Sequence, residues 1–180
     1  FTWRRGFGTL ASRLLEEHGK RVRLSTPARR IVLEGGKVRG VETDDGFMDA
    51  DAVICATPAT AALELMPELP DSLRGPLGKV RYSACCHVIL ALRERIFPDG
   101  WYGVGFPRRE GSFFNLCDNS RKSPHYAPEG CGLIHCFTYG RHSHELLALE
   151  DGEILRRVTE EIGRYFSRMP DEPLFAVIRR

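Results

Sequence analysis

Three groups of residues have types and spacings that could support chemistry, and the first is a glycine pair near the start of the chain. Gly6, Gly8 and Ala11 fit the pattern G-x-G-x-x-A, which in a dinucleotide-binding loop places a pyrophosphate at the N-terminus of a helix. Such a loop follows a buried strand and precedes a second strand with a carboxylate for the ribose hydroxyls. Here only five residues precede Gly6, and the next strand ends at Ser25 and Thr26 without a carboxylate. We therefore interpret the glycine pair as the entry to a helix, not as a phosphate-binding loop.

The second group combines cysteine and histidine, which are ligands that zinc prefers. Its members, all within fourteen residues, are Cys131, His135, Cys136, His142 and His144. The two cysteines lack the C-x-x-C spacing of zinc sites, and His135 and Cys136 are neighbours on one predicted strand, so that their side chains point to opposite faces. We interpret the group as a core cysteine with solvated histidines and predict no metal site.

The third group, Cys85, Cys86 and His87, places a thiol beside an imidazole and could form a nucleophile. Adjacent residues of a strand alternate between its faces, however, and apolar surroundings raise the pKa of a thiol. No Ser-His-Asp order and no strongly paired carboxylates stand out for acyl or glycosyl transfer. No catalytic residue is therefore named from the sequence.

Aromatic residues of the second half of the chain could line an apolar substrate pocket, and they could equally form the core of a sheet. They are Tyr82, Trp101, Tyr102, Phe106, Phe113 and Phe114. Both interpretations stay open at this point.

The composition is that of an ordinary globular chain with little net charge. Its 180 residues are 42% hydrophobic and 28% charged, and 26 basic against 24 acidic residues give a charge of +2. A net charge this small creates no strong positive potential that would attract nucleic acid, and we predict no nucleic-acid partner. The six cysteines lack the spacing of a disulfide framework, and no apolar run approaches the roughly 18 residues of a membrane span. These features predict a cytoplasmic protein, or one peripheral to a membrane, without a transmembrane segment.

The elements that must position these residues form two predicted lobes, of which residues 1–76 are the first. A helix begins after Thr9, its predicted N-cap. Short strands joined by tight glycine turns, as in a β-meander, follow over 22–24, 28–33, 38–43 and 49–55. The run 52–56 is apolar on both faces, so we expect a buried strand there. It stops at the turn Thr57-Pro58, a place where a ligand could face it.

The second predicted lobe, residues 77–180, is rich in strands. A segment with several prolines, 66–76, separates it from the first. Alternating apolar residues predict strands over 80–92, 101–106, 112–116 and 132–139. One long helix near 151–166 turns its apolar residues inward. The predicted fold class is α+β, with a mixed, largely antiparallel sheet and covering helices.

Four segments occur in an order typical of one enzyme superfamily. They are the glycine-led helix (6–19), R-V-R-L-S-T-P-A-R-R-I (21–31), K-V-R-G-V-E-T-D-D-G (37–46) and D-A-V-I-C-A-T-P (51–58). In this order they resemble the flavin-dependent amine oxidase superfamily, particularly its protoporphyrinogen oxidase and phytoene desaturase-like branch. The resemblance extends more loosely over nearly all of the chain.

This resemblance implies a two-lobed FAD oxidoreductase fold and a reaction that removes hydride from a C–N or C–C bond of a small apolar substrate. The flavin carries the chemistry in such enzymes, so no catalytic side chain is required. The family pattern implies that the backbone of Ala28 contacts the adenine side of FAD. It also implies that Ala56, Thr57 and Pro58 lie near the cofactor.

The segments of the family that bind the pyrophosphate and reach the flavin are not present in these 180 residues. We therefore expect the chain to be an internal fragment that holds FAD weakly or not at all and is inactive by itself. The alternative reading is a non-catalytic α+β module that binds a small molecule or a partner. A homodimer through exposed sheet edges is a further expectation.

Overall fold

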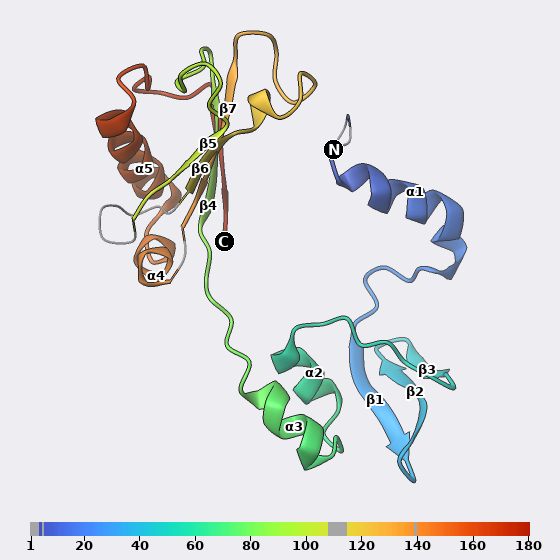
Figure 1. Cartoon of the computed structure of the whole chain (residues 1–180). Coiled ribbons are helices and arrows are strands. Elements are labelled where there is room, and N and C mark those ends of the chain that lie inside the picture. Colours follow the sequence, from blue (N-terminus) through green and yellow to red (C-terminus); the bar gives the residue numbers. More distant parts are fainter. Residues whose placement is uncertain (1–3, 5, 108–114, 139) are drawn as a thin grey trace. The chain divides into compact units, whose positions relative to one another are not determined.

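The computed structural model describes residue 4 and residues 6–107, 115–138 and 140–180, and these form two compact units (Figure 1). Unit 1 comprises residues 1–13 and 83–180, and unit 2 comprises residues 14–82. Each unit contains its own sheet, with five strands in unit 1 and three in unit 2.

The first helix, α1 (Gly8–His18), lies where the sequence predicted a helix, but its start differs. Thr9 is inside the first turn, and its N–H donates to the carbonyl of Gly6 at 3.2 Å. Gly6 has φ +78, a conformation that glycine adopts without strain. This conformation lets the Gly6 carbonyl accept the N–H of Thr9 at the start of the helix. The prediction of Thr9 as the N-cap is therefore wrong. A short 3₁₀ turn, η1 (Gly19–Arg21), follows the helix.

The sheet of unit 2 is a β-meander, as predicted, but its third strand occupies 46–49 instead of the predicted 49–55. Its strands β1 (Ala28–Glu34), β2 (Lys37–Thr43) and β3 (Gly46–Asp49) pair in sequence order, and both pairings are antiparallel. Gly35 and Gly36 join β1 to β2 with φ of +57 and +77, which are the positive values that a two-residue type I′ hairpin requires. Two short helices, α2 (Ala59–Leu65) and α3 (Asp71–Gly78), follow.

Two strands predicted for this unit are absent from it. Residues 22–24 and 52–56 have no regular structure, and the side chain of Ile54 is 95% exposed. A strand requires a neighbour for its backbone N–H and C=O groups. Among the described residues, pairing with β2 continues only as far as Ala50, whose N–H donates to the carbonyl of Arg39 at 3.1 Å. The apolar run therefore has no sheet to enter here, and the prediction of a buried strand is wrong for this structure.

Unit 1 is built on a five-stranded sheet in which every pairing between the described strands is antiparallel. The strand order is β5-β6-β7-β4-β8, so β5 and β8 are the edges. The elements are β4 (His87–Leu92), β5 (Gly103–Gly105), β6 (Asn115–Asp118), η2 (Asn119–Arg121), β7 (Gly132–Phe137), α4 (Arg141–Leu147), α5 (Asp151–Tyr165) and β8 (Phe175–Arg179).

Helix α5 lies along this sheet and closes the core of unit 1 (Figure 1). Its inward residues Ile154, Val158 and Ile162 have no solvent exposure, as the helical spacing predicted. They pack against the sheet residues Val88, Leu90, Leu92, Leu116, Ile134 and Cys136, which are also fully buried. The core therefore occupies one face of the sheet.

The strand predicted over 80–92 begins only at His87. One irregular pair extends the sheet by a residue, because the N–H of Thr138 donates to the carbonyl of Cys86 at 3.1 Å. The residues before Cys86 have no strand partner among the described residues. The predicted hairpin of 101–106 with 112–116 is present as β5 and β6, while Ser112, Phe113 and Phe114 lie outside the described residues, as does Tyr139.

No helix in the described part of the chain is both long and apolar enough to cross a membrane.

Candidate functional site

The face of the unit 1 sheet opposite α5 is half-buried and carries polar side chains among apolar ones. Side chains alternate along a strand, so the residues between the core positions must point to this second face. We call it the open sheet face, and its residues are His87, Ile89, Asn115, Cys117, Leu133, His135, Phe137 and Val177. The alternation also places His135 on this face and Cys136 in the core, as predicted. The prediction of a solvated histidine is wrong for His135, because this side chain is half-buried between the strands and contacts His87.

Two histidines meet at the centre of the open sheet face. His87 lies opposite Phe137 in the β4–β7 pairing, and His135 lies opposite Ile89, so that the two histidines are diagonal neighbours. Nε2 of His87 is 3.0 Å from Nδ1 of His135. The His87 ring also stacks on Phe137, with centroids 4.2 Å apart and an angle of 11° between the planes.

Burial keeps both imidazoles neutral. It lowers the pKa of His135 to about 4, with a further contribution from neighbouring His87. Burial and the charge of Arg179 also lower the pKa of His87. One neutral ring therefore donates an N–H to the other. The pair can orient a polar atom of an apolar ligand without placing a charge on the face.

Because His135 is harder to protonate in the folded chain than in the unfolded chain, stability should fall on acidification. The contribution of the neutral ring is complete above about pH 6.5 and is lost as the pH falls from the ordinary pKa of 6.5 toward about 4. We expect a loss of about 1 kcal/mol over this window once solvent screening of the half-buried ring is included. Urea unfolding at several pH values measures it. His135→Gln should flatten this dependence, and an equal slope in the variant would contradict the assignment.

Three thiols of unit 1 are held as neutral groups by burial. Burial raises the pKa of Cys86, Cys117 and Cys136. The Cys117 thiol donates to Oδ1 of Asn115 at 2.7 Å on the open sheet face. The raised pKa of Cys86 supports the expectation that its thiol is not a nucleophile. No group of three or more metal-ligating side chains with the geometry of a metal site occurs within the described residues.

The residues predicted to contact a cofactor all lie in unit 2, on its surface. Ala28 begins β1 opposite Thr43 and is exposed. Ala56, Thr57 and Pro58 are exposed in the segment that precedes α2. Among the described residues, no backbone hydrogen bond is formed by 51–57, so the backbone N–H and C=O groups of this segment are unpaired. A ligand recognised through backbone atoms fits such a surface.

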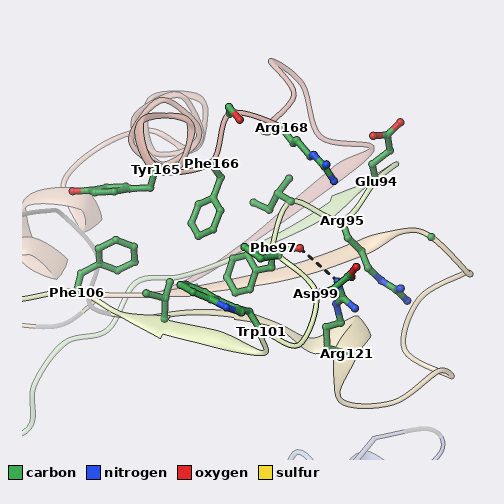
Figure 2. A pocket seen from close by; sticks show the side chains of 15 residues that line it. Glu94, Arg95, Phe97, Asp99, Trp101, Phe106, Arg121, Tyr165, Phe166 and Arg168 are labelled. Atoms are coloured by element: carbon green, nitrogen blue, oxygen red, sulfur yellow. Dashed lines mark hydrogen bonds and ion pairs between the residues drawn. The ribbon is translucent and has the colours of Figure 1, made fainter.

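The predicted aromatic residues do not form one group. Trp101 and Phe106 line a cavity of about 840 Å³ on the α5 side of unit 1 (Figure 2). Tyr102 donates from its hydroxyl to Oδ1 of Asn119 at 3.1 Å. The hydroxyl of Tyr82, in unit 2, accepts the N–H of Ala59 at 2.7 Å.

The histidine pair and the charged residues of that cavity were not found from the sequence. His87 and His135 each continue an alternating apolar pattern, which marks them as strand residues. Their contact depends on the register of β4 with β7, and local spacing contains no information on that register.

Comparisons with known proteins give a consistent result. The family model described as flavin containing amine oxidoreductase matches residues 1–180. The chain is 26% identical over 175 residues to coproporphyrinogen III oxidase of Bacillus subtilis, covering 93% of this chain and 37% of that protein. It is 26% identical over 176 residues to a zeta-carotene-forming phytoene desaturase of Myxococcus xanthus, covering 88% of this chain and 33% of the relative. The solved structure of a protein from Exiguobacterium assigned as a protoporphyrinogen oxidase superimposes with a TM-score of 0.82 at 23% identity, over 99% of this chain and 39% of its own.

Proposed function

Since the chain belongs to the flavin containing amine oxidoreductase family, we propose that it is part of a longer FAD-dependent oxidoreductase that removes hydride from a C–N or C–C bond of an apolar substrate. The resemblance noted in the sequence is confirmed by the family match. The predicted fold class is confirmed by the structural likeness and by the antiparallel sheets. The chain spans 37% and 33% of the two curated relatives, so the activity is proposed for the whole protein.

The observation that carries this proposal is the open sheet face. Its central histidines are neutral at pH 7, its other residues are apolar or uncharged, and Arg179 lies next to it at the end of β8. A half-buried surface of this kind binds an apolar molecule and orients it through a few polar atoms. The His87–His135 pair supplies such atoms. Its role in the proposal is to position the substrate and to limit the access of water.

The surface of unit 2 supports the cofactor part of the proposal. Ala28 and the segment 56–58 present exposed small side chains and backbone atoms, which suit the backbone contacts that the family pattern implies. When bound, FAD supplies the hydride acceptor. In this proposal, backbone atoms of Ala28 and of residues 56–58 contact the bound cofactor. The flavin, not a side chain of this chain, carries the chemistry.

The proposal is tested with the full-length protein that contains this chain. It should purify with a flavin absorbance band, and anaerobic addition of an oxidisable apolar substrate should bleach that band. The names of the relatives make phytoene, an apolar polyene, the first substrate to try, and coproporphyrinogen III, which bears carboxylates on an otherwise apolar macrocycle, the second. A full-length protein that purifies without flavin and does not acquire it from added FAD would contradict the proposal and favour the non-catalytic module.

Within that protein, Ala56→Arg should reduce flavin occupancy to less than about a tenth of the wild-type value, because a long charged side chain displaces a close backbone contact. The measurement is the ratio of flavin to protein absorbance after gel filtration. Thr60→Arg is the matched control, since Thr60 is also exposed and lies four residues further on, in α2. Equal occupancy in the two variants would remove the 56–58 segment from the proposed cofactor site.

The isolated 180-residue chain should hold FAD weakly or not at all. A pyrophosphate is normally held by a glycine-rich loop at the start of a helix after a buried strand, and only five residues precede Gly6 here. A stoichiometric flavin band that survives gel filtration of the isolated chain would overturn this expectation.

A further inference from the structure

The cavity in unit 1 lies on the other side of the sheet from the open sheet face. Its walls are the loop after β4, strand β5, η2 and the C-terminal end of α5. Ile96, Phe97 and Phe106 in its wall belong to the core cluster under α5. The volume of about 840 Å³ is within the range that holds a small organic ligand. A ligand here would not touch the His87–His135 pair.

One end of this cavity is aromatic. Figure 2 shows Phe97, Phe166, Trp101 and Phe106 around it, with Tyr165 beside Phe106. The rings of Phe97 and Phe166 stack with centroids 4.7 Å apart and an angle of 14°, and since Phe97 is only 2% exposed, Phe166 is the ring of this pair that a ligand can reach. Trp101 is 50% exposed although it is one of the largest side chains of the chain. A flat apolar ligand would cover this ring and bury its exposed surface.

The other end is charged, with arginine in excess. Arg95, Arg121 and Arg168 lie there with Glu94 and Asp99 (Figure 2), so that the end has a formal charge of +1. Nη2 of Arg121 donates to Oδ1 of Asp99 at 2.9 Å, and Nε of Arg95 donates to the hydroxyl of Ser120 at 3.3 Å. Arg168 makes no hydrogen bond or ion pair with a described residue.

The three arginines act on one carboxylate. The hydrogen bond from Arg121 lowers the pKa of Asp99, and the charges of Arg121, Arg168 and Arg95 lower it further. The Asp99 side chain is fully exposed, so this carboxylate lies at the mouth of the cavity and is not enclosed by protein atoms. The position of the Asp99 carboxylate therefore marks where the arginines stabilise a negative charge. The donors of Arg168 stay available for a second negatively charged group.

We propose that this cavity binds a flat aromatic carboxylate, with its ring against Phe166 and Trp101 and its carboxylate at Arg168 and Arg95. The excess of arginine disfavours a cation, and a wholly apolar ligand would leave the free donors of Arg168 unused. The site is independent of flavin, and its test needs only the 180-residue chain.

The probe is naphthoate, and its neutral isostere naphthamide is the control ligand. Isothermal titration calorimetry of the chain should show saturable binding of naphthoate that weakens as salt is added. Binding should be at least about ten-fold tighter than that of naphthamide, as expected for a charge-assisted hydrogen bond. The indole N–H resonance of Trp101 should shift on binding.

Three variants locate the anion. Arg168→Gln should weaken naphthoate binding about ten-fold and leave naphthamide unchanged. Arg164→Gln, an equally exposed arginine of α5 that does not line the cavity, should change neither. Asp99→Asn removes the competing carboxylate and should tighten naphthoate binding. Equal affinities for the two ligands, no saturable binding, or an unchanged affinity in Arg168→Gln would each overturn the proposal.

Discussion

Replacing Leu90 with alanine is expected to lower the free energy of unfolding of the chain by about 2–5 kcal/mol. Leu90 has no solvent exposure and lies on β4, between Ile134 of β7 and Ala176 of β8. The side chain packs in the core under α5, so its removal loses buried apolar contacts and leaves a cavity that the strands on both sides cannot close. Urea unfolding followed by circular dichroism measures the effect.

Leu174→Ala is the matched control for this substitution. Leu174 belongs to the same unit, but its side chain is 47% exposed. Only its backbone is fixed, through an N–H that donates to the carbonyl of Ala91 at 2.8 Å. We expect a loss of less than about 1 kcal/mol. Similar losses for the two variants would show that the core does not lie under α5.

Gly40→Ala should destabilise unit 2 by about 3 kcal/mol, because this position has no room for a methyl group. A Cβ at Gly40 would lie 2.1 Å from the carbonyl oxygen of Met48 and 2.7 Å from Cζ of Phe47. The oxygen belongs to the backbone of β3, so it can move only if the β2–β3 pairing changes. Hydrogen exchange of the β2 and β3 amides should accelerate accordingly. The change should not affect unit 1.

Gly78→Ala tests whether the effect depends on that close approach. Gly78 is the last residue of α3, and an added Cβ would meet no atom within 4 Å. Alanine favours a helix over glycine by about 1 kcal/mol, so stability should be unchanged or higher. If both glycine variants destabilise unit 2 equally, the steric argument at Gly40 fails.

The elements that the sequence predicted correctly are those with local causes. The spacing of Ile154, Val158 and Ile162 follows the period of a helix, and α5 forms there. Gly35-Gly36 supplies the positive φ values of a two-residue hairpin, and the meander follows from it. In both cases the information lies within a few residues of the chain.

The predictions that failed concern strands that depend on a distant neighbour. The run 52–56 has the composition of a buried strand, but nothing in the described residues pairs with it, and Ile54 is exposed. Residues 80–86 alternate as a strand would, yet β4 begins only where β7 and β8 are available, at His87. Composition reports how well a residue suits a sheet, and it cannot report whether a partner strand is present.

The sequence by itself determined the family resemblance, the α+β class, the meander and the long helix, because motifs, turns and helical period are local properties. The tertiary structure alone decided which residues come together: His87 contacts His135 on one face of the sheet, and Arg168 and Phe97 line one cavity on the other. These contacts depend on strand register and on burial, which arise from long-range packing. For the same reason, the neutral state of the histidine pair follows from the folded chain and not from residue type.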